Sequence, residues 1–151
     1  MIISVSPFAA LDPLTAYSLW KLRQDVFVIE QECLFHDLDG LDLLPDTRHV
    51  VLEEEQGAVL GCARVLQDSS DGRPTWRIGR VALHPTVRGQ GWADRLMEAA
   101  LSVTPDRDVV LDAQTPLAGW YATHGFAVDG AEFLEDGIPH LPMRRAVGAD
   151  D

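Results

Sequence analysis

Two glycines lie between a β-rich run and an amphipathic run, in the segment Arg88-Gly89-Gln90-Gly91-Trp92-Ala93. Glycine lets backbone N–H groups approach a ligand closely, and the unpaired N–H groups in the first turn of a helix attract anions. The segment therefore predicts a phosphate-binding turn. The alternative is an ordinary connection between a strand and a helix, in which Arg88 would be a solvated turn residue.

The spacing within this turn argues against two common nucleotide-binding motifs. A P-loop needs Lys-Ser or Lys-Thr after its second glycine, where this chain has Trp92-Ala93. The dinucleotide fingerprint needs a third glycine at position 94, where Asp94 stands, and a carboxylate there would face a pyrophosphate poorly. Taken alone, the turn indicates a phosphate group without naming the ligand.

Charge is distributed unevenly along the chain, whose formal net charge is −12. This charge argues against nucleic-acid binding, because neutralising phosphates requires a basic surface. One acidic window holds nine acids and the single base Arg48: Glu30, Glu32, Asp37, Asp39, Asp42, Asp46, Glu53, Glu54 and Glu55. One basic window contains the glycine turn and sets five arginines against Asp94: Arg73, Arg77, Arg80, Arg88 and Arg95.

The 151 residues match the usual size of one domain, so we expect a single domain over residues 1–151. No apolar run approaches the roughly 18 residues of a membrane span, and the N-terminus lacks the pattern of a secretory signal. We therefore expect a cytoplasmic protein without a membrane partner. Cys33 and Cys62 form no C-x-x-C pair and are expected to be buried thiols. Zinc at Cys33, His36 and Asp37 is the alternative, but a second pair of ligands is not evident, so no metal is predicted.

Alternating and helical spacings of apolar residues predict ten elements in the order β, α, β, β, β, α, β, α, β, β. The predicted helices cover residues 15–30, 92–103 and 117–124, the first because Leu19, Leu22, Val26 and Ile29 recur every three or four residues. The predicted strands cover residues 2–5, 49–53, 59–66, 76–83, 108–113, 126–128 and 140–144. Loops are expected at 31–47, with one helical turn, and at 132–137.

Arg88, Gly91 and Ala93 match the coenzyme A motif of the GNAT superfamily, Arg/Gln-x-x-Gly-x-Gly/Ala, and Trp120-Tyr121-Ala122-Thr123-His124-Gly125-Phe126 resembles a later segment of that family. Residues 22–31, 39–42 and 135–140 resemble its ElaA-like branch. The resemblance covers nearly the whole chain. It implies an α/β (α+β) fold in one domain, with a mixed, mostly antiparallel and twisted sheet of six to seven strands that is splayed at the middle and flanked by helices. The strand at 76–83 resembles one that carries a bulge.

The resemblance also implies an N-acetyltransferase in which a primary amine attacks acetyl-CoA directly in a ternary complex. Arg88, Gly89, Gln90, Gly91, Trp92 and Ala93 would surround the pyrophosphate, and the contacts further along the cofactor would be Val81, Ala82, Leu83 and Gln114. Tyr121 would be the general acid, because a phenol of pKa about 10 stays protonated at neutral pH. Its alternative is packing against Trp120 and Phe126. The general base stays open among Glu30, Glu32, Asp37, Asp39, Asp136 and His140, with Glu30 and His140 taken as the catalytic candidates.

Glu32, Asp37 and Asp39 are predicted to bind the acceptor, and an acidic groove would favour a cationic small-molecule or peptide amine. A solvated acidic face is the alternative. Two other functions stay open. The protein could sense an acyl-CoA without transfer, or it could use another acyl donor, because Arg23-x-x-Val26-Phe27 also resembles acyl-homoserine lactone synthases. A homodimer is compatible with the sequence.

Overall fold

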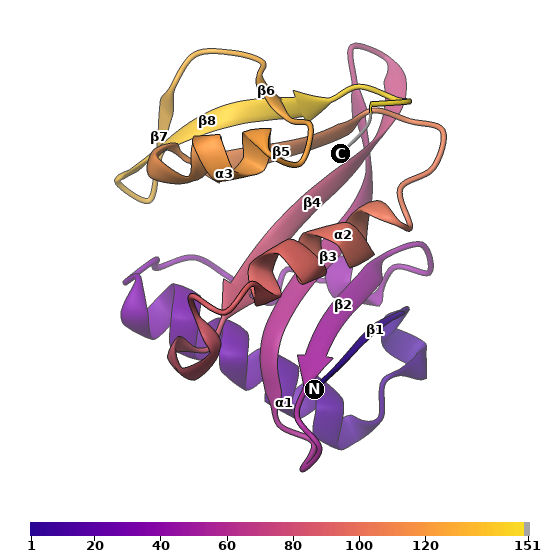
Figure 1. The fold of residues 1–151 in the computed structure, drawn as a ribbon, viewed down its shortest axis with the longest axis vertical. Helices are drawn as coiled ribbons and strands as arrows, with labels where there is room; N and C mark the ends of the chain where they lie inside the picture. The colour runs from indigo at the N-terminus through magenta and orange to yellow at the C-terminus, as the bar shows by residue number, and fades with distance from the viewer. Residues whose placement is uncertain (150–151) are drawn as a thin grey trace.

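A computed structural model describes residues 1–149 and shows one mixed sheet with helices on both faces (Figure 1). Within these residues the sheet has eight strands in the order β1-β2-β3-β4-β5-β8-β6, and β7 also pairs with β8. All pairings are antiparallel except that of β4 with β5. The strands are β1 (Ile2–Ser6), β2 (Arg48–Glu53), β3 (Val59–Ser70), β4 (Arg73–Leu83), β5 (Val109–Gln114), β6 (Ala127–Val128), β7 (Phe133–Glu135) and β8 (Ile138–Arg145). The predicted fold class is confirmed.

The α-helices are α1 (Pro13–Arg23), α2 (Trp92–Leu101) and α3 (Ala118–Ala122). Helix α1 begins after Asp12, whose side chain accepts a hydrogen bond from the Thr15 backbone N–H at 2.9 Å, and Pro13 supplies the fixed φ of the first helical position. Short 3-10 turns lie at Phe8–Ala10, Leu41–Leu43, Pro85–Val87 and Thr115–Leu117. The turn at Leu41–Leu43 is the one expected within the loop at 31–47.

The first predicted helix, at 15–30, is wrong in its second half. Helix α1 ends at Arg23 and continues as a π-helix, Gln24–Glu30. A π-helix has more residues in each turn than an α-helix, so it rotates side chains away from the α-helical stripe. Ile29, which the predicted pattern placed on the buried face, is therefore 64% exposed, whereas Val26 stays buried.

Helices α1 and α2 cover opposite faces of the sheet. Leu19 and Leu22 of α1 pack in a cluster with Val51, and α2 packs on the face that carries Val50. Successive residues of a strand point to opposite faces, so Val50 and Val51 can serve two separate clusters. The second cluster includes the buried side chains of α2, which are Leu96, Met97 and Ala100.

The sheet divides between β4 and β5. Their parallel pairing is confined to Trp76 with Val109 and Arg77 with Val110, after which the strands separate. Beyond Arg77, β4 also bulges against β3: the register shifts between Cys62 and Arg64, and Arg80 has a left-handed φ of 53°. The bulge and the splay that the family resemblance implied are both present.

One strand was missed by the sequence analysis. Residues 133–135, predicted as loop, form β7 and pair with β8 across a tight turn in which Asp136 and Gly137 have φ values of 49° and 76°. Asp-Gly is a strong hairpin signal when strands flank it. The short acidic strand lacks a clear alternating pattern, so only the turn residues could have revealed it.

No helix within residues 1–149 has both the length and the apolar composition needed to cross a bilayer.

Candidate active site

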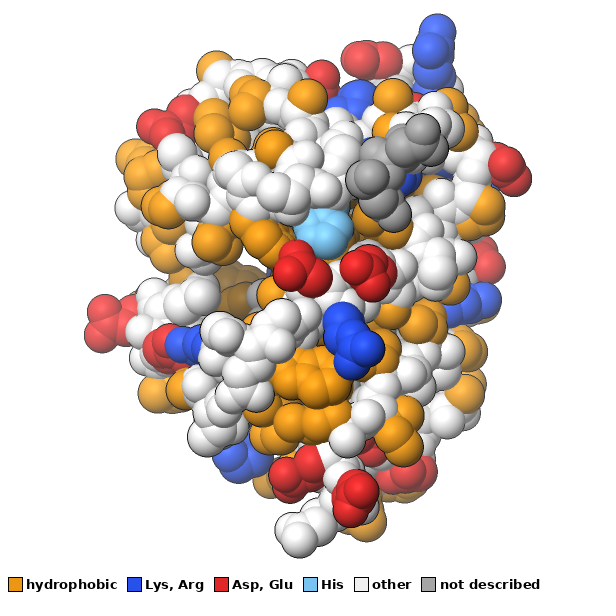
Figure 2. Space-filling model, in the orientation of Figure 1, with side chains coloured by type: hydrophobic (Ala, Val, Ile, Leu, Met, Phe, Trp, Pro, Cys, Tyr) orange, Lys and Arg blue, Asp and Glu red, His pale blue; other side chains and the backbone are white. Residues whose placement is uncertain are grey.

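The splay between β4 and β5 opens a cavity of about 580 Å³. Figure 2 shows a hollow between the part of the molecule built on β1 to β4 and the part built on β5 to β8. The cavity wall includes Gly79, Arg80 and Val81 from the free length of β4, and Leu111 and Gln114 from β5. The π-helix, α3 and the β7–β8 hairpin complete it. Residues far apart in the chain therefore meet where β4 has lost its neighbouring strand.

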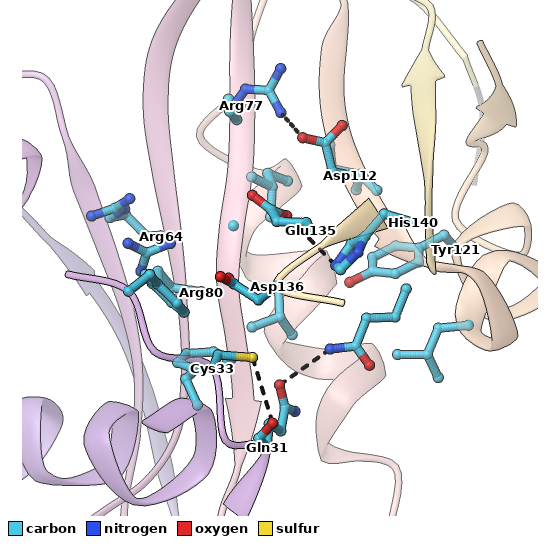
Figure 3. Close-up of a pocket in the computed structure, with 18 of the residues that line it drawn as sticks. Gln31, Cys33, Arg64, Arg77, Arg80, Asp112, Tyr121, Glu135, Asp136 and His140 are labelled. Atoms are coloured by element: carbon cyan, nitrogen blue, oxygen red, sulfur yellow. Dashed lines mark hydrogen bonds and ion pairs between the residues drawn. The ribbon is translucent and has the colours of Figure 1, made fainter. Parts of the chain in front are cut away.

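Tyr121 and His140 line the cavity on the β5–β8 side (Figure 3). Each is only 8% exposed. Burial raises the pKa of Tyr121 to about 12, so its phenol keeps its proton throughout the physiological range. The Tyr121 ring also makes edge contacts with Trp120 and Phe126, so its predicted packing and its place on the cavity wall occur together.

The protonation of His140 follows from its surroundings. Its Nδ1 lies 2.7 Å from the carbonyl oxygen of Ile138, which can only accept a hydrogen bond, so Nδ1 carries a proton. In the neutral ring, Nε2 then holds the lone pair. The nearest charged group is Glu135, whose Oε2 lies 3.7 Å from Nε2, and the ring stacks on Phe133. His140 therefore has the tautomer that a base acting through Nε2 requires.

Two acids at the tip of the β7–β8 hairpin, Glu135 and Asp136, face the cavity (Figure 3). Their charges reach across it to Cys33: burial raises the pKa of that thiol, and Asp136 and Glu135 raise it further. The predicted acceptor-binding set did not include Glu135. Its position depends on the hairpin that the sequence analysis read as loop, and the Asp136-Gly137 turn is the signal that could have placed it.

The glycine turn follows β4 at the open end of the splay. Gly89 and Gly91 have φ values of 73° and 86°, a region that favours glycine, and Gly91 is the residue that precedes α2. Trp92 and Ala93 open the helix, so its free N–H groups belong to this turn. The side-chain amide of Gln90 donates a hydrogen bond to the carbonyl oxygen of Thr86 at 3.2 Å. The turn does not line the cavity. It follows the end of β4, the strand from which Val81 contributes to the cavity wall.

Arg88 is held from two directions. Its Nε donates to the carbonyl oxygen of Leu83 at 3.0 Å, and its two terminal nitrogens bind the two carboxylate oxygens of Glu30 at 2.7 Å each. The hydrogen bonds from Arg88 lower the pKa of Glu30. A carboxylate stabilised in its ionised form is a weaker base, so this geometry suits Glu30 to orienting Arg88 rather than to accepting a proton.

The remaining predicted cofactor contacts lie along the splay. Val81 is on the cavity wall, Ala82 is buried beneath it in the α1 cluster, and Leu83 offers the carbonyl that Arg88 binds. Gln114 lines the cavity and donates to the side-chain oxygen of Gln31 at 3.2 Å. The structure thus places Val81 and Gln114 on facing strands.

Asp37 and Asp39 do not line this cavity. They belong to a buried ion network: Arg23 binds Asp37 and Asp42, Arg64 binds Asp39 and Asp42, and Arg80 lies near Asp37 and Asp39. Three acids against three bases leave the network without net charge. Glu32, with a φ of 56°, is exposed beside the cavity residues Gln31 and Cys33. The acids chosen for acceptor binding are therefore mostly engaged elsewhere.

Three arginines of the basic window also have acidic partners. Arg77 binds Asp68 and Asp112, and Arg80 and Arg88 have the acidic partners described above. Within residues 1–149, no group of three or more His, Cys, Asp and Glu side chains is arranged to hold a metal ion.

A splayed mixed sheet with a bulged fourth strand and a glycine turn before α2 defines an acyltransferase-like fold, and comparison identifies its family. A family model described as Acetyltransferase (GNAT) domain matches residues 26–147. The chain belongs to the GNAT acetyltransferase family.

Its relatives confirm the ElaA-like branch. The UPF0039 protein Rv2851c of Mycobacterium tuberculosis is 47% identical over 135 residues, which cover 89% of this chain and 86% of that protein. Protein ElaA of Escherichia coli is 38% identical over 135 residues, with 87% of each chain covered. The crystal structure of E. coli ElaA superposes with a TM-score of 0.87 at 34% identity, covering 95% of this chain and 98% of that one. An acyl-CoA N-acyltransferase from Pseudomonas aeruginosa gives a TM-score of 0.88 at 38% identity, covering 96% and 99%.

Proposed function

We propose that this protein transfers an acetyl group from acetyl-CoA to a primary amine. The observation that carries the proposal is the separation of β4 from β5 after Arg77. It leaves one edge of β4 without a partner strand, opens the cavity beside that edge and leads along the strand to the glycine turn. Membership of the GNAT family supports a CoA thioester as the donor.

The donor would lie along the free edge of β4. Backbone groups of β4 beyond Arg77 face no strand on this side, and those near Val81 and Leu83 can bind the amide groups of a pantetheine arm as a neighbouring strand would. Leu83 lies about 7 Å beyond Val81, at about 3.3 Å per residue, in the direction of the turn. The pyrophosphate would then meet the N–H groups of residues 88–93, together with Arg88.

The chemistry needs a group that removes a proton from the amine and a group that stabilises the leaving sulfur. The bound ammonium first releases one proton to water, which gives the neutral amine. As the amine nitrogen then bonds to the thioester carbon and the carbon–sulfur bond breaks, Nε2 of His140 accepts the second proton. Glu135, 3.7 Å away, stabilises the imidazolium. An unpaired N–H of β4 would bind the oxyanion.

Tyr121 would act on the leaving thiolate through its hydroxyl. Complete proton transfer is uphill, because the pKa of Tyr121 is about 12 whereas that of an ordinary thiol is about 8.5. Its contribution is therefore a hydrogen bond donated to the developing thiolate, and solvent supplies the final proton. For this role the phenol must keep its proton, and burial ensures that it does by raising the pKa of Tyr121.

The acceptor would be a cationic amine, drawn in by Glu135 and Asp136. Asp112, the other acid on the cavity wall, pairs with Arg77, and the buried network neutralises itself. Glu135 and Asp136 are therefore the acids on the wall without an arginine partner among the ion pairs of residues 1–149. The acidic side chains that would favour a cationic acceptor are therefore those of the hairpin, and not Asp37 and Asp39.

The test measures thiol release from acetyl-CoA with a panel of amines, and acetyl-CoA binding by calorimetry. Gly91→Glu is expected to abolish binding, because it adds a strained side chain and a negative charge at the anion site. Tyr121→Phe is expected to keep the affinity but to lower turnover about tenfold or more.

Gly57→Glu is the matched control, because Gly57 also has a positive φ, 91°, but lies in the exposed β2–β3 turn. It should bind acetyl-CoA normally. Binding without thiol release for any amine would mean that the protein is a sensor. Unchanged affinity in Gly91→Glu would show that the turn does not hold the donor.

A further inference from the structure

The carboxylate of Asp94 forms a bridge between the two parts of the splayed molecule. Asp94 is the third residue of α2, in the helical turn proposed to bind the pyrophosphate. Its Oδ1 accepts hydrogen bonds from the indole Nε1 of Trp120 at 2.8 Å and from Nε2 of His124 at 2.9 Å. Because a carboxylate only accepts, His124 carries a proton on Nε2.

The donors and the acceptor belong to different halves of the sheet. Helix α2 packs against β1 to β4, and α3 packs against β5 and β6 (Figure 1). The halves separate after Arg77, so the hydrogen bonds of Asp94 cross the splay on the face that bears both helices. Trp120 lies within α3, and His124 follows two residues after its end.

The donors are also closely tied to Tyr121. The Trp120 ring makes edge contacts with the rings of Tyr121, at 4.8 Å between centroids, and of His124, at 5.1 Å. The backbone of His124 donates to the carbonyl oxygen of Tyr121 and accepts from Arg145 of β8. A displacement of Trp120 or His124 would therefore move Tyr121 on the cavity wall.

The charge of Asp94 would otherwise oppose the ligand proposed for this turn. An acid in the first turn is favourable for the helix itself, but beside a pyrophosphate it is repulsive. The hydrogen bonds from His124 and then Trp120 lower the pKa of Asp94 and hold its carboxylate toward α3. The side chain is thus held by partners that belong to the catalytic half.

We propose that Asp94 is a positioning residue, which fixes α3 and Tyr121 relative to the cofactor turn by bridging α2 to Trp120 and His124. Its effect on turnover rests on the proposed acetyl transfer. The bridge itself is a property of the free protein and can be measured without any substrate.

The test compares Asp94→Ala, Asp94→Asn and the control Glu98→Ala in the full chain. Glu98 is an exposed acid of the same helix, one turn further on. Without ligand, Asp94→Ala is expected to speed amide hydrogen exchange at residues 118–126 about tenfold, because α3 loses its link to α2, and Glu98→Ala to leave it unchanged.

With acetyl-CoA and an amine, Asp94→Ala is expected to lower kcat about tenfold while its affinity for acetyl-CoA stays equal or rises, because a repulsive charge has gone. Asp94→Asn keeps an acceptor oxygen and is expected to retain at least about half of kcat. A general loss of structure would instead weaken acetyl-CoA binding in both variants.

The outcomes separate this inference from the proposed function. If no amine is acetylated by the wild-type protein, acetyl transfer is refuted, and faster exchange confined to residues 118–126 still supports the bridge. Exchange equal in Asp94→Ala and Glu98→Ala would overturn the bridge. So would equal losses of kcat in Asp94→Asn and Asp94→Ala, because the charge and not the hydrogen-bonded link would then be what turnover needs.

Discussion

Glu30 and His140 can both accept a proton, and their surroundings separate them. Glu30 is bound through both oxygens to Arg88, which lowers the pKa of its carboxyl group. His140 donates from Nδ1 to Ile138, its Nε2 lies 3.7 Å from Oε2 of Glu135, and the residue lines the cavity. The sequence does not distinguish the two residues, because Arg88, which binds Glu30, lies 58 residues away and the hairpin that carries Glu135 was predicted as loop.

His140→Gln is expected to remove the acidic limb of the pH–rate profile. A general base acts only in its unprotonated form, so loss of the base should remove the decrease of activity at low pH. The titratable groups that line the cavity with this ring include Cys33, Glu135, Asp136 and Tyr121, and Tyr121, with a pKa of about 12, keeps its proton at pH 9 and below. Turnover would be measured from pH 5 to 9 at saturating acetyl-CoA.

Glu30→Gln is the matched comparison for this profile. It should keep the acidic limb and weaken acetyl-CoA binding, because Arg88 loses a charged partner that orients it. If Glu30→Gln loses the acidic limb of the pH–rate profile and His140→Gln retains it, then Glu30 is the general base and His140 is not.

At the scale of elements, the β4 bulge and the loop at 31–47 are joined by the buried arginine and aspartate network. Arg23, 1% exposed, reaches from the end of α1 to Asp37 and Asp42, and Arg64 reaches from β3 to Asp39 and Asp42. Arg80, at the bulge, lies over the ring of Phe35. Arg64, Arg80 and Phe35 all line the cavity, so the network fixes part of its wall.

Asp42→Asn is expected to lower the free energy of unfolding by about 3 kcal/mol, because it leaves two buried arginines short of a counter-charge. Urea unfolding followed by circular dichroism would measure the change. Glu55→Gln removes an exposed acid and should change the stability by less than about 0.5 kcal/mol. A small loss in Asp42→Asn, comparable to that of the control, would mean that Asp37 and Asp39 suffice to balance the arginines.

At the scale of the whole molecule, the pKa shifts set how stability depends on pH. Burial raises the pKa of Asp42 and of Asp39, but the hydrogen bonds and charges of the arginines outweigh it, so both lie below their usual value. Burial lowers the pKa of His49, which lies in the same network. For all three groups the unfolded chain takes up protons more readily than the folded one as the pH falls.

We expect the free energy of unfolding to be greatest between about pH 7 and 8 and to fall in two stages on acidification. Above about pH 8.5 it should also decrease, because burial raises the pKa of Cys62 to about 12 and the unfolded chain releases that thiol proton first. His49 contributes the first decrease, which begins below its unfolded pKa of about 6.5, and the carboxylates contribute a steeper one below about pH 4. Urea unfolding at a series of pH values would resolve both. His49→Gln should remove the first stage and keep the second, and a wild-type curve that is flat down to pH 5 would contradict the assignment.

Most of the sheet, two of the three helices and the glycine turn follow from patterns that are local in the sequence. The helix at 15–30 failed in part because a helical spacing of apolar residues does not distinguish an α-helix from the π-helix at Gln24–Glu30. Strand β7 was missed because three residues beside an Asp-Gly turn give little alternation.

The sequence by itself determined the family, the order of the elements other than β7, and the glycine turn between β4 and α2, because each depends on neighbours within a few residues. Only the tertiary structure decided which charges face which partners. Asp42 lies 19 residues from Arg23, Glu30 lies 58 from Arg88, and Asp94 lies 30 from His124. Such pairs form when the sheet brings distant segments together. Three aspartates of the acidic window therefore lie in a neutral network, while the acids of a short hairpin face the cavity.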